Sequence, residues 1–301
     1  LGVRTGINSI DEWGKKLGLG EYTGIDLPGE SKGFRASRET KKLLRSDPAE
    51  EAVDRPWAPN SALLFAQLVV ARGVIVLNDP IHLTDASNKT YFQHFPEEVR
   101  PVTCISRDAD AIKEFISAQG GRGVIKPLQG SGGQGVFVVN GDGGANVNQM
   151  IDAVIRDGYA IAQEYLPAAA DGDLRLLTLN GRPLQVDGRY ACFRRYNDSG
   201  DARSNISAGG KVELAEPDAD ALRLAELVAP KLVRDGMYLA GLDIVGDKLM
   251  EVNVDTPGGI NMAEELTGVD FSGHIINDLA RKVRLRNEYR GNLTNVELAM
   301  L

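Results

Sequence analysis

The stretch LMEVNVDTPGG (249–259) is mostly apolar up to Val254, yet Glu251 and Asn253 interrupt it. These two residues are two positions apart, so in a strand both side chains lie on the same face. One interpretation is an ordinary amphipathic edge strand whose polar face meets water. The other is a ligand site, because a carboxylate and an amide both offer oxygen atoms.

A third oxygen comes from the segment GLDIVGDKLMEVNV (241–254), which predicts a hairpin that turns at Gly246-Asp247. With an odd number of residues in the loop, Asp243 lies opposite Glu251 on the same face, whereas a two-residue loop puts it on the wrong face. Two neighbouring carboxylates repel each other, and a hard divalent cation relieves that repulsion. Oxygen ligands alone favour Mg²⁺ or Mn²⁺ over zinc.

A glycine-rich loop lies within KPLQGSGGQGVFVV (126–139), between two predicted strands. The backbone N–H groups of Gly130, Gly132 and Gly133 can approach phosphate oxygens because no side chain stands in the way, and Lys126 adds a cation. The P-loop and the dinucleotide fingerprint both lead into a helix, so this loop is neither. A flexible turn is the alternative, but a nucleoside triphosphate would also explain a magnesium site.

The composition is that of an ordinary globular protein. The 301 residues are 25% charged and 43% hydrophobic, and they allow two or three domains. The net charge of −8 disfavours nucleic-acid binding, and no apolar run reaches the ~18 residues of a membrane span. Because there are only two cysteines and the chain does not begin like a secretory signal, we expect a cytoplasmic protein with reduced thiols.

The elements that position these motifs are a mixture of helices and strands. Helices are expected at 61–73 (buried), 85–95, 108–121, 146–158, 219–236 and 272–283. Strands are expected at 74–78, 124–129, 136–140 and 159–166, with hairpins over 174–186, which contains Asn180-Gly181, and over 241–254. This mixture predicts an α+β class or α/β sandwich layers rather than a purely parallel, doubly wound sheet.

These motifs, in this order, resemble those of bacterial glutathione synthetases, which belong to the ATP-grasp superfamily. The resemblance covers roughly residues 43–285 and includes AQEYLP (162–167), DGDLR (171–175), ARSNISAGG (202–210) and the segment 241–259. It implies an ATP-grasp fold, in which two α+β subdomains clasp ATP. It also implies a ligase that activates a carboxylate as an acyl phosphate and joins it to an amine.

The resemblance further implies a role for each matching residue. Phosphate binding falls to Lys89, Lys126 and the glycines of the loop. A hinge that meets adenine is formed by Gln163, Glu164, Tyr165 and Leu166. The magnesium ligands are Asp243, Glu251 and Asn253, and the catalytic residues are Arg175, Arg203 and Asn205. Residues 194–210 match a mobile loop that closes over the site.

Simpler interpretations exist for several of these residues. Lys89 is also explained as a solvated helix lysine, and Arg175 and Arg203 as surface ion-pair residues. Glu164 is also explained as an exposed strand residue of which only the backbone is used.

The N-terminal residues depart from the family. Residues 6–33 resemble a fragment of a penicillin-binding transpeptidase, but the catalytic motifs of that family are missing, which argues against a β-lactam target. The expected organisation has four parts: an atypical segment (1–34), a partial α/β substrate domain (35–105), the ATP-grasp domain (106–290) and a tail (291–301).

The function implied by the resemblance is an ATP- and Mg²⁺-dependent glutathione synthetase. Its partners are small molecules, a dipeptide-like acyl donor such as γ-glutamylcysteine and an amino acid such as glycine, without nucleic acid or membrane. One alternative is an ATP-grasp ligase with another donor or amine. Another is a nucleotide-binding module that lacks ligase activity because its N-terminal domain is incomplete. A homo-oligomer stays an open alternative.

Overall fold

The computed structural model describes residues 59–86, 88–128, 135–140, 145–156, 158–197 and 210–301, together with Glu12. The chain divides into two units, Leu1–Ala58 and Pro59–Leu301. Apart from Glu12, the segment 1–34 and its transpeptidase-like stretch lie outside the described residues. The features that follow all belong to the second unit.

The first sheet has four antiparallel strands in the order β1-β4-β2-β3. Its strands are β1 (Thr103–Ser106), β2 (Gly123–Pro127), β3 (Phe137–Val139) and β4 (Ala160–Glu164). Two helices, α6 (Ala109–Ala118) and α7 (Ala145–Ile155), pack on it through Ile112 and Ile151, which meet Ile125 of the sheet. Because side chains alternate along a strand, Lys126 lies on the face opposite to these helices.

The second sheet is also antiparallel and runs in the order β10-β9-β5-β11-β12, with β6 beside β5. Its strands are β5 (Asp173–Leu179), β6 (Arg182–Pro183), β9 (Cys192–Tyr196), β10 (Lys211–Leu214), β11 (Leu239–Val245) and β12 (Lys248–Asn253). A separate ribbon pairs β7 (Gln185–Val186) with β8 (Arg189–Tyr190).

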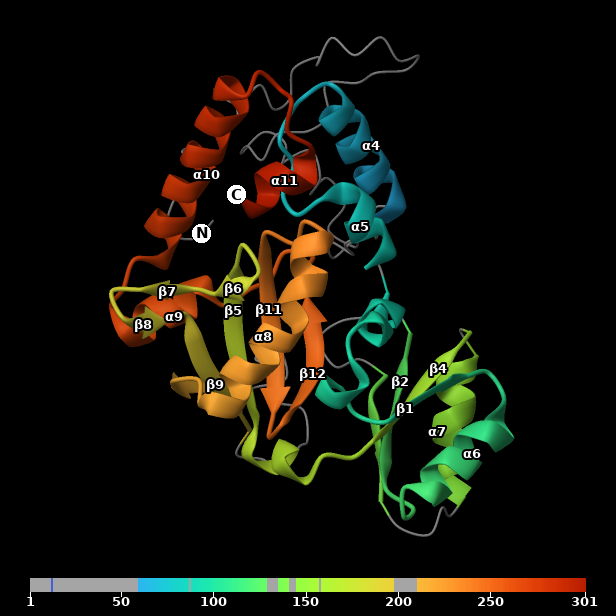
Figure 1. Cartoon of the computed structure of the whole chain (residues 1–301). Coiled ribbons are helices and arrows are strands. Elements are labelled where there is room, and N and C mark those ends of the chain that lie inside the picture. The colour runs from blue at the N-terminus through green and yellow to red at the C-terminus, as the bar shows by residue number, and fades with distance from the viewer. Residues whose placement is uncertain are drawn as a thin grey trace, which may run out of the picture. The chain divides into compact units, whose positions relative to one another are not determined.

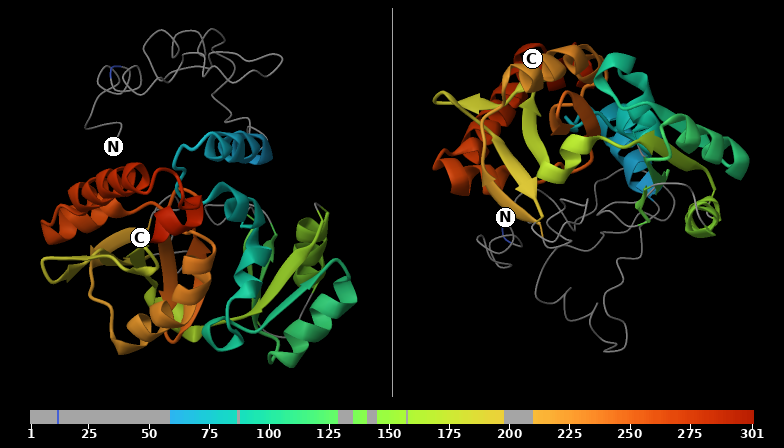
Figure 2. Two further views of the ribbon diagram at one scale, coloured as in Figure 1. Left: turned by 45° about the horizontal axis from the view of Figure 1, so that its top comes forward. Right: turned by 90° about the horizontal axis from the view of Figure 1, so that it is seen from below.

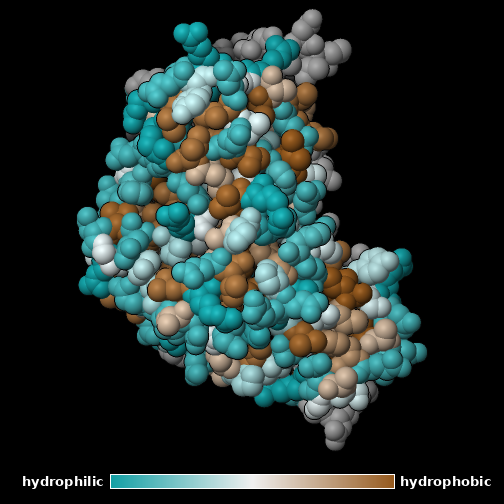
Figure 3. Space-filling view, in the orientation of Figure 1, coloured by the Kyte–Doolittle hydropathy of each residue, from teal (hydrophilic) through white to brown (hydrophobic). Residues whose placement is uncertain are grey.

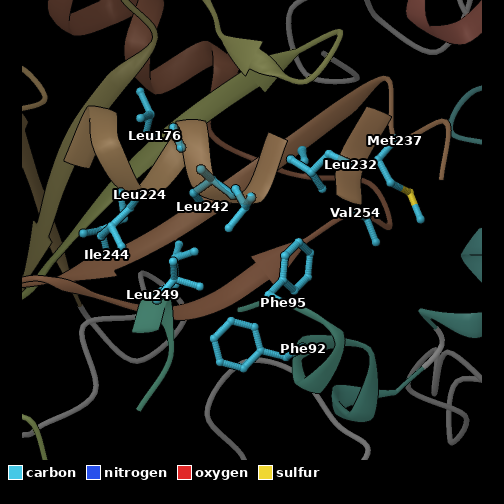
Figure 4. Packing of buried hydrophobic residues seen from close by; sticks show 14 of the residues in the cluster. Phe92, Phe95, Leu176, Leu224, Leu232, Met237, Leu242, Ile244, Leu249 and Val254 are labelled. Carbon is cyan, nitrogen blue, oxygen red and sulfur yellow. The ribbon is translucent and has the colours of Figure 1, made fainter. Parts of the chain in front are cut away.

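Helices cover both faces of the second sheet, as Figures 1 and 2 show from three directions. On one face, Leu176 packs with Leu224 of α8 (Ala219–Arg234) and with Phe92 of the 3-10 helix η1 (Lys89–His94); Figure 4 shows this core. On the other face, Leu177 packs with Phe271 and other residues of the C-terminal helices. These helices are α9 (Ile260–Thr267), α10 (Phe271–Glu288) and α11 (Asn295–Met300). Leu176 and Leu177 face opposite ways because they are consecutive strand residues.

Most predicted elements are confirmed, including the α+β class, the strands on both sides of the glycine-rich loop and the two hairpins. The hairpin at Asn180-Gly181 turns through two residues with positive φ (53° and 74°), as an Asn-Gly turn requires. The remaining short elements are α5 (Pro80–Asp85) and the 3-10 helices η2 (Glu97–Val99) and η3 (Pro167–Asp171). The C-terminal residues 291–301, expected as a tail, include α11, whose Leu298 and Ala299 are buried.

Two predicted elements are wrong in part. Residues 74–78 form no strand, because the link to the second sheet is made by the side chain of Asn78 rather than by a backbone ladder. Its amide donates to the carbonyls of Leu239 and Val254 and accepts from the N–H of Leu239. The helix expected at 85–95 is instead α5 followed by η1, which Asn88 caps by accepting from the N–H of Thr90.

The helix expected at 61–73 forms as α4 (Pro59–Ala71), but the prediction that it is buried is wrong. Leu64 is 57% exposed, Phe65 61% and Leu68 43%, because in the described part of the chain the helix packs mainly against α5. Figure 3 shows apolar surface over this region. Within the described ranges, none of the helices has the length and apolar character needed to span a bilayer.

Gly172 has the most constrained glycine backbone near the second sheet. Its φ of 90° and ψ of −162° fall in a region that is essentially restricted to glycine. A Cβ atom at this position would lie 2.0 Å from the carbonyl oxygen of Arg195 on the neighbouring strand. The glycine of DGDLR is therefore required for the start of β5 to lie against β9.

We expect Gly172→Ala to lower the free energy of unfolding by ~3 kcal/mol or more, because backbone strain adds to a contact that only a backbone shift relieves. Gly188→Ala is the matched control. Gly188 also has a positive φ (77°), but no described atom lies within 4 Å of its Cβ position, so we expect a loss of ~1 kcal/mol. Urea unfolding of both variants tests this, and equal losses would contradict the required contact.

Candidate active site

A row of charged side chains crosses one face of the second sheet. Asp173 of β5 is directly opposite Arg195 of β9, Arg175 of β5 is opposite Asp243 of β11, and Asp243 is opposite Glu251 of β12. All five belong to the face that carries Leu177, since they are separated from it by the strand period of two or by direct pairing. We call Asp173, Arg175, Arg195, Asp243 and Glu251 the charged row.

The charges in the row neutralise one another at close range. Arg175 donates to both carboxylate oxygens of Asp243, with Nε 2.5 Å from Oδ1 and Nη2 3.0 Å from Oδ2. Arg195 donates to Asp173 over 3.0 Å and 2.5 Å, and its Nη2 lies 2.9 Å from Asp243. Burial alone would lower the pKa of the Arg195 guanidinium, but Asp243 and Asp173 raise it above its ordinary value. The Arg195 guanidinium is therefore a permanent cation.

The position of Asp243 opposite Glu251 depends on a β-bulge. The loop between Val245 and Lys248 has two residues, a length for which we expected Asp243 on the wrong face. The register shifts between Asp243 and Ile244, and Met250 of β12 is the additional residue. One extra residue inverts the alternation of side chains, so the bulge restores the pairing that an odd loop would produce.

The three predicted metal ligands, Asp243, Glu251 and Asn253, lie on one face of β11 and β12. Asn253 donates from Nδ2 to Asp243 Oδ2 over 3.1 Å, so its side-chain nitrogen is hydrogen-bonded to the charged row. The described residues contain no cluster of three or more His, Cys, Asp or Glu suited to a metal ion. Two carboxylates and an amide oxygen are nevertheless a hard-oxygen set, which suits Mg²⁺ or Mn²⁺ better than zinc.

Lys89 and Lys126 both interact electrostatically with Glu251. Burial lowers the pKa of Lys126 to about 8, an effect that Glu251 opposes and Lys89 reinforces. Burial also lowers the pKa of Lys89, with Glu251 again opposing it. Lys89 begins η1, and its backbone N–H donates to the carbonyl of Leu128, next to the glycine-rich loop. The residue is partly buried, so it is not a plain solvated lysine.

The side chains of the four predicted hinge residues make different contacts. The side chain of Glu164 accepts a hydrogen bond from the N–H of Val102 over 2.8 Å. Glu164 is therefore not a strand residue of which only the backbone is used. The ring of Tyr165 lies 3.7 Å from the guanidinium carbon of Arg122. Gln163 is buried, and its side chain contacts Lys126 rather than open space. Leu166 caps η3 without a side-chain hydrogen bond.

Some predicted site residues lie outside the described part of the chain. These are Gly130, Gly132 and Gly133 of the glycine-rich loop, and Arg203 and Asn205 of the expected mobile loop. The expected start of that loop is wrong: Arg194 and Arg195 belong to strand β9 and pair with Glu213 and Val212 of β10. Arg175 is buried in an ion pair, which excludes the interpretation as a surface residue.

Arg195 and Asp173 were not among the predicted site residues. The resemblance placed residues 194–210 in a mobile loop, whereas Arg195 belongs to β9, a strand within the sheet. The available signal was a spacing of two residues, typical of strands. It puts Asp173 and Arg175 on one face of β5, and buried Phe193 and Arg195 on one face of β9.

Comparison with known proteins identifies the family. Residues 88–268 match the family described as prokaryotic glutathione synthetase, ATP-grasp domain. The chain belongs to this family. Among its relatives, the glutathione synthetase of Thermosynechococcus vestitus is 36% identical over 223 residues, which is 72% of this chain and 67% of that protein. The glutathione synthetase of Vibrio parahaemolyticus is 32% identical over 248 residues, or 80% of this chain and 73% of the relative.

Solved structures confirm the fold of this glutathione synthetase family member. The crystal structure of D-cycloserine synthetase DcsG covers 70% of the chain, and the chain covers 81% of it, with a TM-score of 0.51 and 16% identity. A RimK domain ATP-grasp protein from Sphaerobacter thermophilus covers 72% of the chain, and 76% of it is covered in return, with a TM-score of 0.50 and 20% identity. The predicted ATP-grasp fold is therefore confirmed.

In metal-free buffer, we expect the amino group of Lys126 to titrate near pH 8, well below the ~10.4 of an ordinary lysine. Glu251 stabilises the charged form, so Glu251→Gln should lower this pKa further. The chemical shift of the ¹³Cε atom in labelled protein reports the titration, and Lys126→Arg identifies the signal. Titration of Lys126 near pH 10, or a pKa that rises in Glu251→Gln, would contradict the electrostatics of the site.

Proposed function

We propose that this ATP-dependent carbon–nitrogen ligase is a glutathione synthetase that joins γ-glutamylcysteine to glycine. The ligase class and the use of ATP follow from family membership. One observation about the site supports the proposal most directly: Glu251 of the charged row is electrostatically coupled to both Lys89 and Lys126. The two lysines and this carboxylate are thus close enough to act on one ligand.

The charge balance of this region suits a nucleotide bound with a divalent cation. Among the described residues that carry the site, four cations stand beside three carboxylates, namely Lys89, Lys126, Arg175 and Arg195 beside Asp173, Asp243 and Glu251. Clustered cations favour a polyanion, and burial lowers the pKa values of Lys89 and Lys126, an effect that added negative charge would oppose. Bound phosphate oxygens would supply that charge.

We infer the following division of work. Lys89 and Lys126 would neutralise the phosphates of ATP, and Asp243, Glu251 and Asn253 would hold Mg²⁺ or Mn²⁺. Such an ion would supply charge neutralisation at the transferring phosphoryl group. Arg175 and Arg195 hold Asp243 in place, and the Arg175 Nη1 donates to the carbonyl of Gly258 over 3.0 Å, which ties the TPGG segment to the row.

Other roles rest on the sequence resemblance. The attack of the donor carboxylate on the γ-phosphate gives an acyl phosphate and ADP; attack by the amine then releases phosphate. The glycines of the loop would bind phosphates, the backbone of residues 163–166 would meet adenine, and Arg203 and Asn205 would act beside the acyl group. We also propose a cytoplasmic setting, in which the free thiols of Cys104 and Cys192 stay reduced.

The decisive experiment measures ADP release with ATP, Mg²⁺, γ-glutamylcysteine and glycine. We expect release that depends on both substrates and yields the tripeptide. Release with a different acyl donor or amine only would favour another ATP-grasp ligase. Nucleotide binding without turnover would favour a binding module, and each of these outcomes would overturn the proposed reaction.

Glu251→Gln tests the metal assignment. The substitution is nearly isosteric, so we expect a folded protein, but losing one carboxylate ligand should reduce turnover at least 100-fold. The Mg²⁺ concentration needed for half-maximal nucleotide binding should also rise, which calorimetry measures without turnover. The control is Lys248→Gln on the same strand. In the described hydrogen bonds, the amine of Lys248 donates only to the carbonyl of Glu98. Wild-type metal dependence in Glu251→Gln would make the oxygen set structural.

A further inference from the structure

A line of side-chain hydrogen bonds leads to the amino group of Lys126. It crosses three neighbouring strands of the first sheet, β1, β4 and β2. Thr103 is directly opposite Gln163, and Gln163 is directly opposite Val124, which shares a face with Lys126. All three polar side chains therefore lie on the face opposite to α6 and α7.

The direction of every hydrogen bond in this line is determined by chemistry. Lys126 Nζ only donates, and it reaches Gln163 Oε1 over 3.0 Å. The amide nitrogen of Gln163 then donates to Thr103 Oγ1 over 3.2 Å, and the hydroxyl of Thr103 donates to the carbonyl of Pro101 over 2.8 Å. The line ends on a backbone oxygen that cannot donate, so a flipped amide would leave two donors facing each other.

Because Gln163 is buried, losing any hydrogen bond of this line is costly. Gln163 is 1% exposed, and a buried amide that loses a partner is costly, so each bond supports the next. A flexible lysine side chain loses rotamer entropy when it is held in place, and a hydrogen-bonded amino group has already lost part of that entropy before any ligand binds. Among the described residues, Gln163 Oε1 is the acceptor that Lys126 Nζ reaches, and an ammonium ion has two further N–H groups that can donate to anionic partners.

We propose that Gln163 and Thr103 are positioning residues, which hold the amino group of Lys126 in the direction from which it binds the nucleotide phosphates. The inference rests on the proposed function, because it assumes that Lys126 binds phosphate. It assigns the side chain of Gln163 to Lys126 and not to adenine, and it gives Thr103 a role that no motif in the sequence indicates.

The test compares Thr103→Val, which keeps the shape but removes the hydroxyl, with Thr103→Ser, which restores it. We expect Thr103→Val to raise the KM for ATP and the Kd for ADP about tenfold, the effect of about one lost hydrogen bond. The KM for glycine should stay the same. Thr103→Ser should recover most of the lost nucleotide affinity, and Gln163→Met should behave like Thr103→Val.

A double-mutant cycle with Lys126→Met separates positioning from general damage. Once Lys126 is gone, Thr103→Val should cost less than twofold more in ADP affinity. An equal tenfold loss in both backgrounds would mean that Thr103 acts through the fold, and this would overturn the proposal.

The single variant Lys126→Met separates failure of the proposed phosphate contact from failure of the positioning role. If it leaves ADP affinity unchanged, Lys126 does not bind phosphate and both the assignment and the positioning role fail. If it weakens ADP binding while Thr103→Val does not, the proposed function stands and the positioning role is overturned.

Discussion

The bidentate contact between Arg175 and Asp243 is the interaction on which the site depends. Both groups are buried, and an ion pair in such surroundings is stable only if its hydrogen bonds are well aligned. Arg195 and Asp173 extend the pair into a neutral group of four on one face of an antiparallel sheet. Gly172 allows β5 to start against β9, and the bulge at Met250 brings Glu251 beside the group.

The two sheets contribute complementary chemistry. The second sheet supplies carboxylates and arginines that mostly neutralise one another, so Glu251 is the carboxylate that interacts with Lys89 and Lys126. The first sheet supplies Lys126 on the face away from its helices, where buried Gln163 fixes its direction. Burial lowers the pKa values of both lysines, and the negative charge of a polyanion beside them would oppose that effect.

Local pattern predicted much of this fold, because hairpins, amphipathic helices and the period-two placement of Glu251 and Asn253 depend on neighbouring residues. Tertiary contacts decided the rest. The bulge that pairs Asp243 with Glu251 leaves no mark in the hydrophobic pattern, and residues 74–78 attach through Asn78 instead of forming a strand. Arg195 was assigned to a loop because only its distant partners, Asp173 and Asp243, explain a buried arginine in a strand.

A crystal structure with ADP and Mn²⁺, examined by anomalous scattering, tests most directly whether the charged row and the two lysines form one nucleotide site. The result predicted is a manganese peak within coordination distance of the carboxylates of Asp243 and Glu251, with ADP phosphate oxygens in hydrogen-bonding contact with Lys126. Bound ADP whose phosphates lie away from both lysines, or whose manganese lies away from the charged row, would contradict it.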